Sequence, residues 1–191
     1  MTGGAHVLGG DTEFVRGDLK LYTVLPGLGL HRIFAYARVQ AQTGDALPQD
    51  YLGFSRRDDL QIELPSFVPL AFSGVDRVRG YRAFAVGNRV LFGTMEYRVP
   101  LLSDLQTRLL GLVSFGATSL AVFADGGLVW TDGAFDEGAQ RLGAGLELKN
   151  EVRLAGLFSF GHVIGLAWPV GALATEDAYD LYYRIRAAVP F

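Results

Sequence analysis

The sequence predicts an all-β protein built from antiparallel strands, and three observations support this fold class. Five stretches alternate apolar and polar residues with a period of two, the pattern of a strand with one apolar face. The chain of 191 residues contains 25 glycines, 13 phenylalanines and 8 tyrosines, a composition typical of glycine- and aromatic-rich β proteins. Half of the residues are hydrophobic, yet they form no helical heptads, which argues against a helical bundle.

The first two alternating stretches predict a hairpin. Residues 14–22 place Val15, Leu19 and Leu21 on one side and charged residues on the other, and residues 31–42 alternate in the same way. Between them, residues 26–29 read Pro-Gly-Leu-Gly, which indicates a tight turn. Two alternating strands joined by a short turn form an antiparallel hairpin.

Three further alternating stretches lie at residues 90–101, 142–153 and 181–191. In the first, Thr94, Glu96 and Arg98 share the polar face. Residues 109–130 and 154–173 are long and apolar enough to be transmembrane helices by hydropathy. Both contain several glycines and are flanked by segments of period two, so strands are favoured here as well. A polar loop is expected at 132–141 and another at 172–180. The total is about seven strands of roughly ten residues, the length of a tilted transmembrane β-strand.

A connection of roughly 45 residues, at 43–89, is far longer than an ordinary hairpin loop, which indicates a functional segment or a missed element. Residues 60–64 within it predict a short extra strand. The connection ends in the tetrapeptide Val78-Arg79-Gly80-Tyr81.

Three features favour a transmembrane β-barrel over a soluble β-sandwich binding module, which would show the same alternation. Apolar faces are rich in Leu, Val, Ala and Gly, while the opposite faces hold whole charges. Aromatic residues gather near strand ends, as at a membrane interface. The chain also ends on Phe191, in an alternating strand. The predicted fold is therefore an antiparallel transmembrane barrel of about seven or eight strands, or that part of a larger barrel, with the long loop folded into its lumen.

Several function classes find no support in the composition. The net charge is −3 and basic residues are scattered, so no nucleic-acid partner is expected. The absence of cysteine removes disulfides, thiol catalysis and thiolate metal sites. His162 lies near Ser159, but no orienting acid or oxyanion hole is apparent, so no enzymatic activity is expected. No metal site, cofactor or signal peptide is predicted.

Motifs from residue 78 onward carry a resemblance to a known family. They are Val78-Arg79-Gly80-Tyr81, the stretch 93–101 (GTMEYRVPL), Phe123-Ala124-Asp125-Gly126-Gly127, the stretch 143–148 and the terminal Phe191. In this order, over about residues 12–191, the chain resembles the bacterial surface-antigen outer-membrane barrel, the superfamily of BamA-like protein insertases and two-partner-secretion transporters.

The resemblance implies that Arg79, in a loop inside the lumen, contacts acidic residues of the inner wall, here Glu96 and Asp125. Elementary physics agrees, because a carboxylate in an uncharged stretch needs a partner and arginine can bridge two carboxylates. Gly80 would let the loop pass close to the wall. The sequence Asp125-Gly126-Gly127 is also typical of turns, so a turn position for Asp125 is an alternative. Arg79 as an ordinary surface-loop residue and Glu96 as an exposed strand residue are further alternatives. Phe123 and Gly127 belong to the family's strand motif. Its C-terminal strand signal falls on Tyr183, Ile185, Val189 and Phe191.

The family further implies a barrel of about sixteen strands in the bacterial outer membrane. Residues 1–191 would then form a single C-terminal barrel domain or half-barrel. It would be completed by a missing N-terminal half or by other copies, or else close as a small barrel. Its expected partners are membrane lipid and unfolded outer-membrane or secreted proteins, and its expected role is their insertion or translocation. A passive structural or pore-forming barrel is the alternative.

Overall fold

A computed structural model of the chain describes residues 2–4, 13–45, 52–54, 60–63, 77–81, 85–102, 107–109, 113–135, 139–154, 158–170 and 178–188. These residues form strands and turns and contain no α-helix, so the all-β prediction is confirmed for them. No helix long and apolar enough to cross a membrane occurs among them. The helical alternative for the apolar stretches 109–130 and 154–173 is wrong, since their described residues lie in strands.

The strands are β1 (Thr2–Gly4), β2 (Glu13–Pro26), β3 (Arg32–Asp45), β4 (Leu52–Phe54), β5 (Leu60–Glu63), β6 (Ala85–Gly87), β7 (Arg89–Leu102), β8 (Thr107–Leu109), β9 (Val113–Trp130), β10 (Ala139–Leu154), β11 (Phe158–Val170) and β12 (Asp180–Ala188). Seven of them, β2, β3, β7, β9, β10, β11 and β12, are between 9 and 18 residues long. These seven correspond to the strands that the alternating stretches and the two apolar stretches predict, including the hairpin around residues 26–31.

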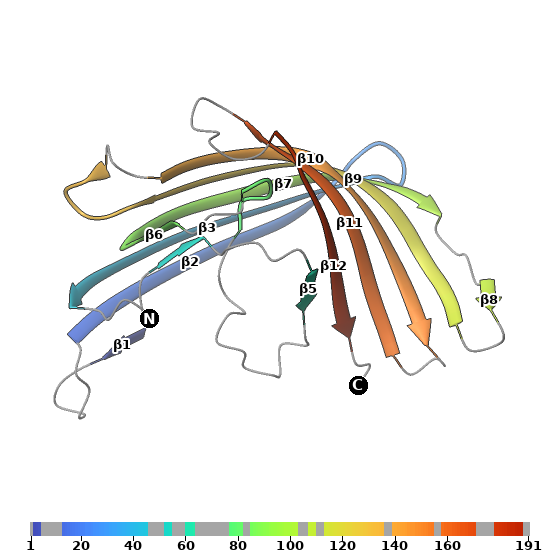
Figure 1. The fold of residues 1–191 in the computed structure, drawn as a ribbon, viewed down its shortest axis with the longest axis horizontal. Coiled ribbons are helices and arrows are strands. Elements are labelled where there is room, and N and C mark those ends of the chain that lie inside the picture. Colours follow the sequence, from blue (N-terminus) through green and yellow to red (C-terminus); the bar gives the residue numbers. More distant parts are fainter. Residues whose placement is uncertain are drawn as a thin grey trace.

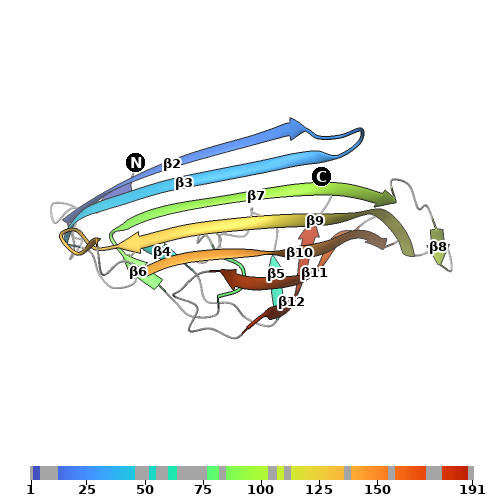
Figure 2. The same cartoon turned by 90° about the horizontal axis from the view of Figure 1, so that it is seen from above.

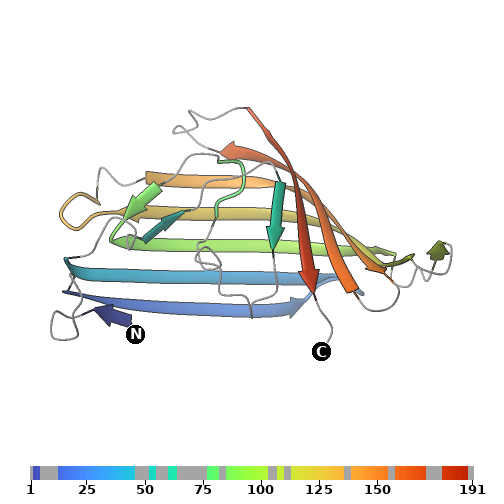
Figure 3. The same cartoon turned by 60° about the horizontal axis from the view of Figure 1, so that its bottom comes forward.

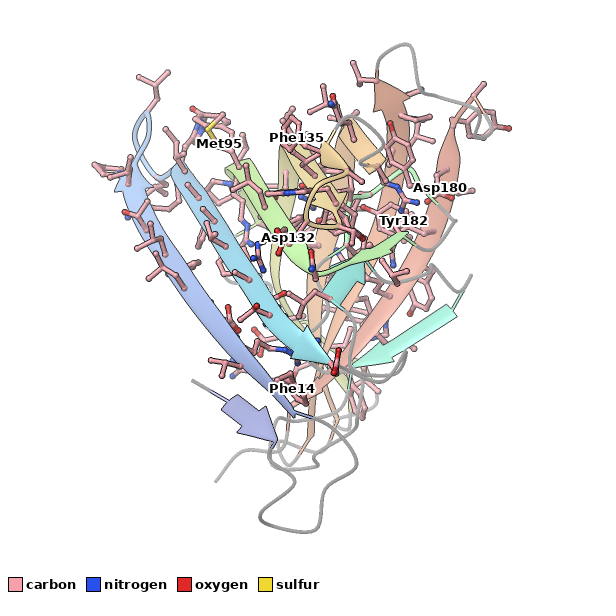
Figure 4. The ribbon with its side chains drawn as sticks, turned by 90° about the vertical axis from the view of Figure 1, so that its left-hand side faces the viewer. Phe14, Met95, Asp132, Phe135, Asp180 and Tyr182 are labelled. Carbon is pink, nitrogen blue, oxygen red and sulfur yellow. The ribbon has the colours of Figure 1, made fainter. Side chains whose placement is uncertain are left out.

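The long strands form one large sheet with simple up-and-down order (Figure 1). The hydrogen-bonded path is β1-β2-β3-β7-β9-β10-β11-β12-β5, with β8 paired to β9. Neighbours on this path are antiparallel, except that β5 pairs with β12 in parallel. The path does not return to its start, so the described strands make an open, curved sheet and not a closed barrel. Figure 4 shows the long strands curving into a trough.

One face of this sheet is apolar and exposed. Leu19, Val39 and Leu91 are successive register partners on β2, β3 and β7, and their exposed fractions are 58%, 47% and 46%. Exposed apolar residues continue on this face across the later strands, with Met95, Val122, Leu142, Leu146, Leu148, Ile164, Val170 and Leu181. This apolar face is the one that the alternation predicts.

The opposite, concave face carries the polar residues and the loop. Arg38 on β3 donates two hydrogen bonds to Asp18 on β2, over 2.9 and 2.7 Å. The segments of the long connection lie on this side of the long strands, with β4 and β6 at one end and β5 near β12 (Figure 2). Strands β4 and β6 pair as a separate two-stranded sheet, seen in front of β7 and β9 in Figure 3. A buried cluster joins them to the large sheet and includes Leu52, Phe54, Val78, Tyr81, Ala85, Val90, Phe92 and Val129.

Several predicted boundaries differ from the structure. The predicted short strand at 60–64 is present as β5, but β4 and β6, of three residues each, were not predicted. The expected loop at 132–141 ends earlier, since β10 begins at Ala139, and β12 begins inside the expected loop at 172–180. Tertiary pairing extends these strands beyond their alternating segments. The expected final strand at 181–191 is seen up to Ala188, and Val189 and Phe191 lie outside the described residues.

Candidate functional site

Residues 77–81, which contain the tetrapeptide, form a turn that lies against the concave face. Gly80 has a φ of 97°, a left-handed conformation that other residues rarely adopt. A Cβ at Gly80 would stand 3.1 Å from the backbone nitrogen of Pro169. On β10, Gly143 faces the carbonyl oxygen of Arg79 so closely that a Cβ there would collide with it. Glycines in the turn and in the wall therefore bring the two backbones into contact.

Asp125, in the middle of β9, is the principal partner of Arg79. The Arg79 Nε donates to Oδ2 of Asp125 over 2.7 Å, and Nη2 donates to Oδ1 over 2.6 Å. Such paired bonds are among the strongest hydrogen bonds that proteins form. The backbone N–H of Arg79 donates to the same Oδ2 over 3.0 Å. Thr94, the register partner of Asp125 on β7, donates its hydroxyl to Oδ1 over 2.6 Å.

Two glutamates bind the remaining nitrogen of the guanidinium. The Arg79 Nη1 donates to Oε1 of Glu96 over 2.8 Å and lies 3.0 Å from Oε1 of Glu147. The side chains of Asp125 and Glu147 are 1% and 0% exposed, and that of Arg79 is 8% exposed. A carboxylate this deeply buried requires charge and hydrogen-bond partners, so the arginine and the acids depend on each other.

Three more cations complete the site. The Nζ of Lys149 lies 2.7 Å from Oε2 of Glu96 and 2.9 Å from Oε2 of Glu147. Arg98 donates to Glu96 over 2.7 Å, and Arg184 on β12 donates to Glu147. Four cations thus face three carboxylates. We call this group, with Thr94, Phe123 and Tyr182, the Arg79 cluster.

Aromatic rings support the cluster, and glycines make room for them. The Cζ of Arg79 lies 3.4 Å from the centre of the Phe123 ring, a cation–π contact. The Phe123 ring covers Gly145, where a Cβ would collide with it. From β12, Tyr182 extends across Gly165 and donates its hydroxyl to Glu147. The cluster therefore joins the loop to β7, β9, β10 and β12.

The neighbours of Arg79 in the tetrapeptide anchor the turn by burial. Val78 and Tyr81 are 1% and 3% exposed and belong to the apolar cluster under β4 and β6. Gly127 on β9 lies beneath Phe54 and Val78, and a Cβ at this position would collide with the Phe54 ring. The Tyr81 hydroxyl accepts a hydrogen bond from the backbone N–H of Leu142 over 3.4 Å.

Arg79 remains charged in this setting. Burial alone lowers the pKa of its guanidinium, but the hydrogen bond and negative charge of Asp125, together with the charge of Glu147, outweigh burial and raise this pKa above its ordinary value. The turn therefore carries a positive charge into the wall.

Replacing Gly143 by alanine is expected to push the turn off the wall. The new methyl group meets the rigid carbonyl of Arg79, and overpacking of this kind costs about 1–3 kcal/mol. Limited proteolysis of the loop and urea unfolding measure the effect. Gly17→Ala on β2 is the matched control, because nothing lies within 4 Å of a Cβ there. Equal behaviour of the two variants would contradict the proposed contact.

The structure brings together most of the residues that the sequence and the resemblance single out. Arg79 meets both Glu96 and Asp125, Phe123 stacks on Arg79, and Gly127 faces Val78. Asp125 lies inside a strand and not in a turn, so the turn interpretation of Asp-Gly-Gly is wrong. The plain surface roles considered for Arg79 and Glu96 are wrong as well, since both side chains are paired and largely buried.

The two C-terminal signal residues that the structure describes stand apart from the cluster. Tyr183 and Ile185 lie on β12 but alternate with Tyr182 and Arg184, so they belong to the other face. His162 pairs through Nδ1 with the Tyr183 hydroxyl, and their rings stack. This contact gives His162 a structural partner on the apolar face.

Sequence reasoning missed Glu147 and Tyr182 as members of the site. In the sequence, Glu147 is one of four charges on the polar face of residues 142–153, with Lys149, Glu151 and Arg153, and nothing distinguishes it from them. Both residues could have been identified from the register of the strands, because Glu147, Gly165 and Tyr182 are successive partners on β10, β11 and β12. A glycine between an acid and a tyrosine marks the place where the ring crosses the middle strand.

Comparison of the chain with protein-family models, curated proteins and solved structures finds no match in any of the three.

Proposed function

We propose that this chain is part of an outer-membrane β-barrel of the bacterial surface-antigen superfamily, and that the barrel assists the insertion or translocation of other proteins. The observation that carries the proposal is the two-sided sheet. One face exposes leucine, valine and methionine over strand after strand, and the other binds a loop through a buried arginine held by three carboxylates. In a soluble protein, an apolar face of this extent is expected to be buried and not exposed opposite a polar face that binds a loop.

The open strand path fits a barrel that is completed by further strands. Unpaired backbone groups at a sheet edge are costly in hydrocarbon, and β2 pairs with β1 only at Phe14, Val15 and Arg16. Beyond these residues, the described strands leave the outer edge of β2 open. In the proposed barrel, strands of an N-terminal half or of a second copy cover this edge, and lipid covers the apolar face.

Lipid exposure of the apolar face is tested with Met95→Arg. Met95 lies within β7 and is 57% exposed. In a bilayer, an arginine near the midplane of a barrel strand costs about 2–4 kcal/mol, whereas an exposed substitution on a soluble protein stays within about 0.5 kcal/mol. Urea titration of the chain folded in lipid vesicles measures the difference. Leu28→Arg, in the turn after β2, is the control and is expected to change stability by less than about 1 kcal/mol. Equal, small effects at both positions would favour the soluble binding module.

The assisting role is tested with liposomes that contain the folded protein. Added unfolded outer-membrane proteins are expected to become protease-protected faster with this protein than with empty liposomes. Leakage of small solutes without any gain in client insertion would instead favour a passive pore.

A further inference from the structure

The edge of β12 is covered by a segment of the protein's own loop. Strand β5 pairs with β12 over four residue pairs, with Leu60 opposite Tyr183, Gln61 opposite Arg184, Ile62 opposite Ile185 and Glu63 opposite Arg186. It is the one parallel pairing among the described strands. Figure 3 shows β5 beside β12, away from β4 and β6. A long internal segment thus occupies the place where another strand would extend the sheet.

This cover is weaker than the pairing on the other side of β12. The β11–β12 ladder contains nine antiparallel pairs, whereas β5 contributes four parallel ones, and parallel pairs are slightly less stable per residue. When β12 loses one neighbour, it therefore loses β5. The peptide groups of residues 183–186 would then form an open template, which is the property that lets sheet edges accept a further strand.

The Arg79 cluster connects this cover to the turn. Tyr182 and Arg184 of β12 both bind Glu147, and Glu147 lies 3.0 Å from Arg79. These two residues alternate with Tyr183 and Ile185, which are register partners of β5. Arg79 and β5 belong to the same connection between β3 and β7, so this connection holds β12 twice, once through the cluster and once along the edge.

We infer that β5 is a removable cover of the β12 edge, kept in place by the Arg79 cluster and exchanged for another strand when the cluster opens. The release of β5 from β12 involves only this chain and does not depend on the proposed function. One part of the inference does rest on the proposed function, namely that the strand that replaces β5 belongs to an unfolded client protein.

The native chain has no cysteine, so pairs of introduced cysteines report the register directly. In the full chain, purified in detergent micelles, Ile62→Cys with Ile185→Cys is expected to form a disulfide rapidly under mild oxidation. Leu60→Cys with Ala187→Cys is four residues out of register, about 13 Å along the strand, and is expected to react at least about tenfold more slowly. Equal rates for the two pairs would overturn the β5–β12 contact.

Coupling to the cluster is tested with a peptide probe. A synthetic peptide of residues 58–65, with cysteine in place of Ile62, is added to the full chain carrying Ile185→Cys. Capture of the peptide as a mixed disulfide is expected to be at least about tenfold faster when Arg79→Ala is also present. Arg79→Lys, which keeps the charge, is expected to give an intermediate rate. Equal capture by all three chains would refute the coupling.

A fold control separates exchange from general unfolding. Leu19 and Val39 are register partners on β2 and β3, two strands that contribute no residue to the cluster. A disulfide between Leu19→Cys and Val39→Cys is expected to form equally well with Arg79 and with Arg79→Ala. The peptide experiment contains neither lipid nor client, so a negative result would contradict the removable cover and not the barrel proposal. A negative result in the liposome assay would contradict the assisting role and not the removable cover.

Discussion

Arg79→Ala is expected to release the turn at residues 77–81 and to abolish assisted client insertion. The physical reason is the state of Asp125. Glu96 keeps Arg98 and Lys149, and Glu147 keeps Lys149 and Arg184. Asp125, with its side chain 1% exposed, loses both guanidinium bonds and keeps two uncharged donors among the partners described above, the backbone N–H of residue 79 and the Thr94 hydroxyl. Removing one member of a buried ion pair costs about 3–5 kcal/mol, most of it from the acid left behind.

Urea unfolding and protease sensitivity of the loop measure the release of the turn. Arg79→Lys is the matched control. It keeps the positive charge but not the fork that binds both oxygens of Asp125, so we expect a smaller loss. Adding Asp125→Asn to Arg79→Ala removes the abandoned charge and is expected to recover part of the stability. An Arg79→Ala protein with native stability, protease pattern and activity would contradict the role assigned to this arginine.

The second large effect is expected from Glu147→Gln. Glu147 is completely buried and contacts Arg79, Lys149, Arg184 and Tyr182. Neutralising it leaves these cations with one carboxylate fewer, and we expect a loss of about 3 kcal/mol or more. It also weakens the link between β10 and β12, because the glutamine oxygen accepts from Tyr182 and Arg184 without a charge, so β12 is expected to exchange its amide hydrogens faster.

Glu151→Gln provides the control for this change. Glu151 lies on the same strand, four residues beyond Glu147, and pairs with Arg153 in solvent. Exposed ion pairs contribute about 0–1 kcal/mol, so its replacement is expected to be nearly neutral. A similar loss in both variants would mean that Glu147 acts merely as one charge of a solvated strand face.

The sequence predicts the fold best where the residues of one strand alternate between apolar and polar on their own. Alternation at residues 90–101 and 142–153 identified β7 and β10, because a period of two follows directly from the pleat. The pairing of Arg79 with Glu96 and Asp125 came from the resemblance, with agreement from the need of a buried acid for a partner. Closure of the sheet had no such signal, because the alternation of a strand is the same in an open sheet and in a closed one.

The features that were missed depend on contacts between distant strands. Glu147 looks like its neighbours Lys149, Glu151 and Arg153 in the sequence, and its complete burial results from the turn and from Tyr182 crossing Gly165. Strands β4 and β6 are too short to show a period. The parallel pairing of β5 with β12 joins segments more than a hundred residues apart, and nothing local in either segment specifies its direction.

The contacts of the Arg79 cluster also bear on the order in which parts of the chain fold. Arg79 and Asp125 are 46 residues apart, and Glu147 and Tyr182 are 35 apart, so each contact must wait for the closure of a long loop, a slow step for chains dominated by distant contacts. Until β9, β10 and β12 have been laid down in sequence, the turn has no complete set of partners. Docking of the turn is therefore expected to be a late step of folding that follows the pairing of β12.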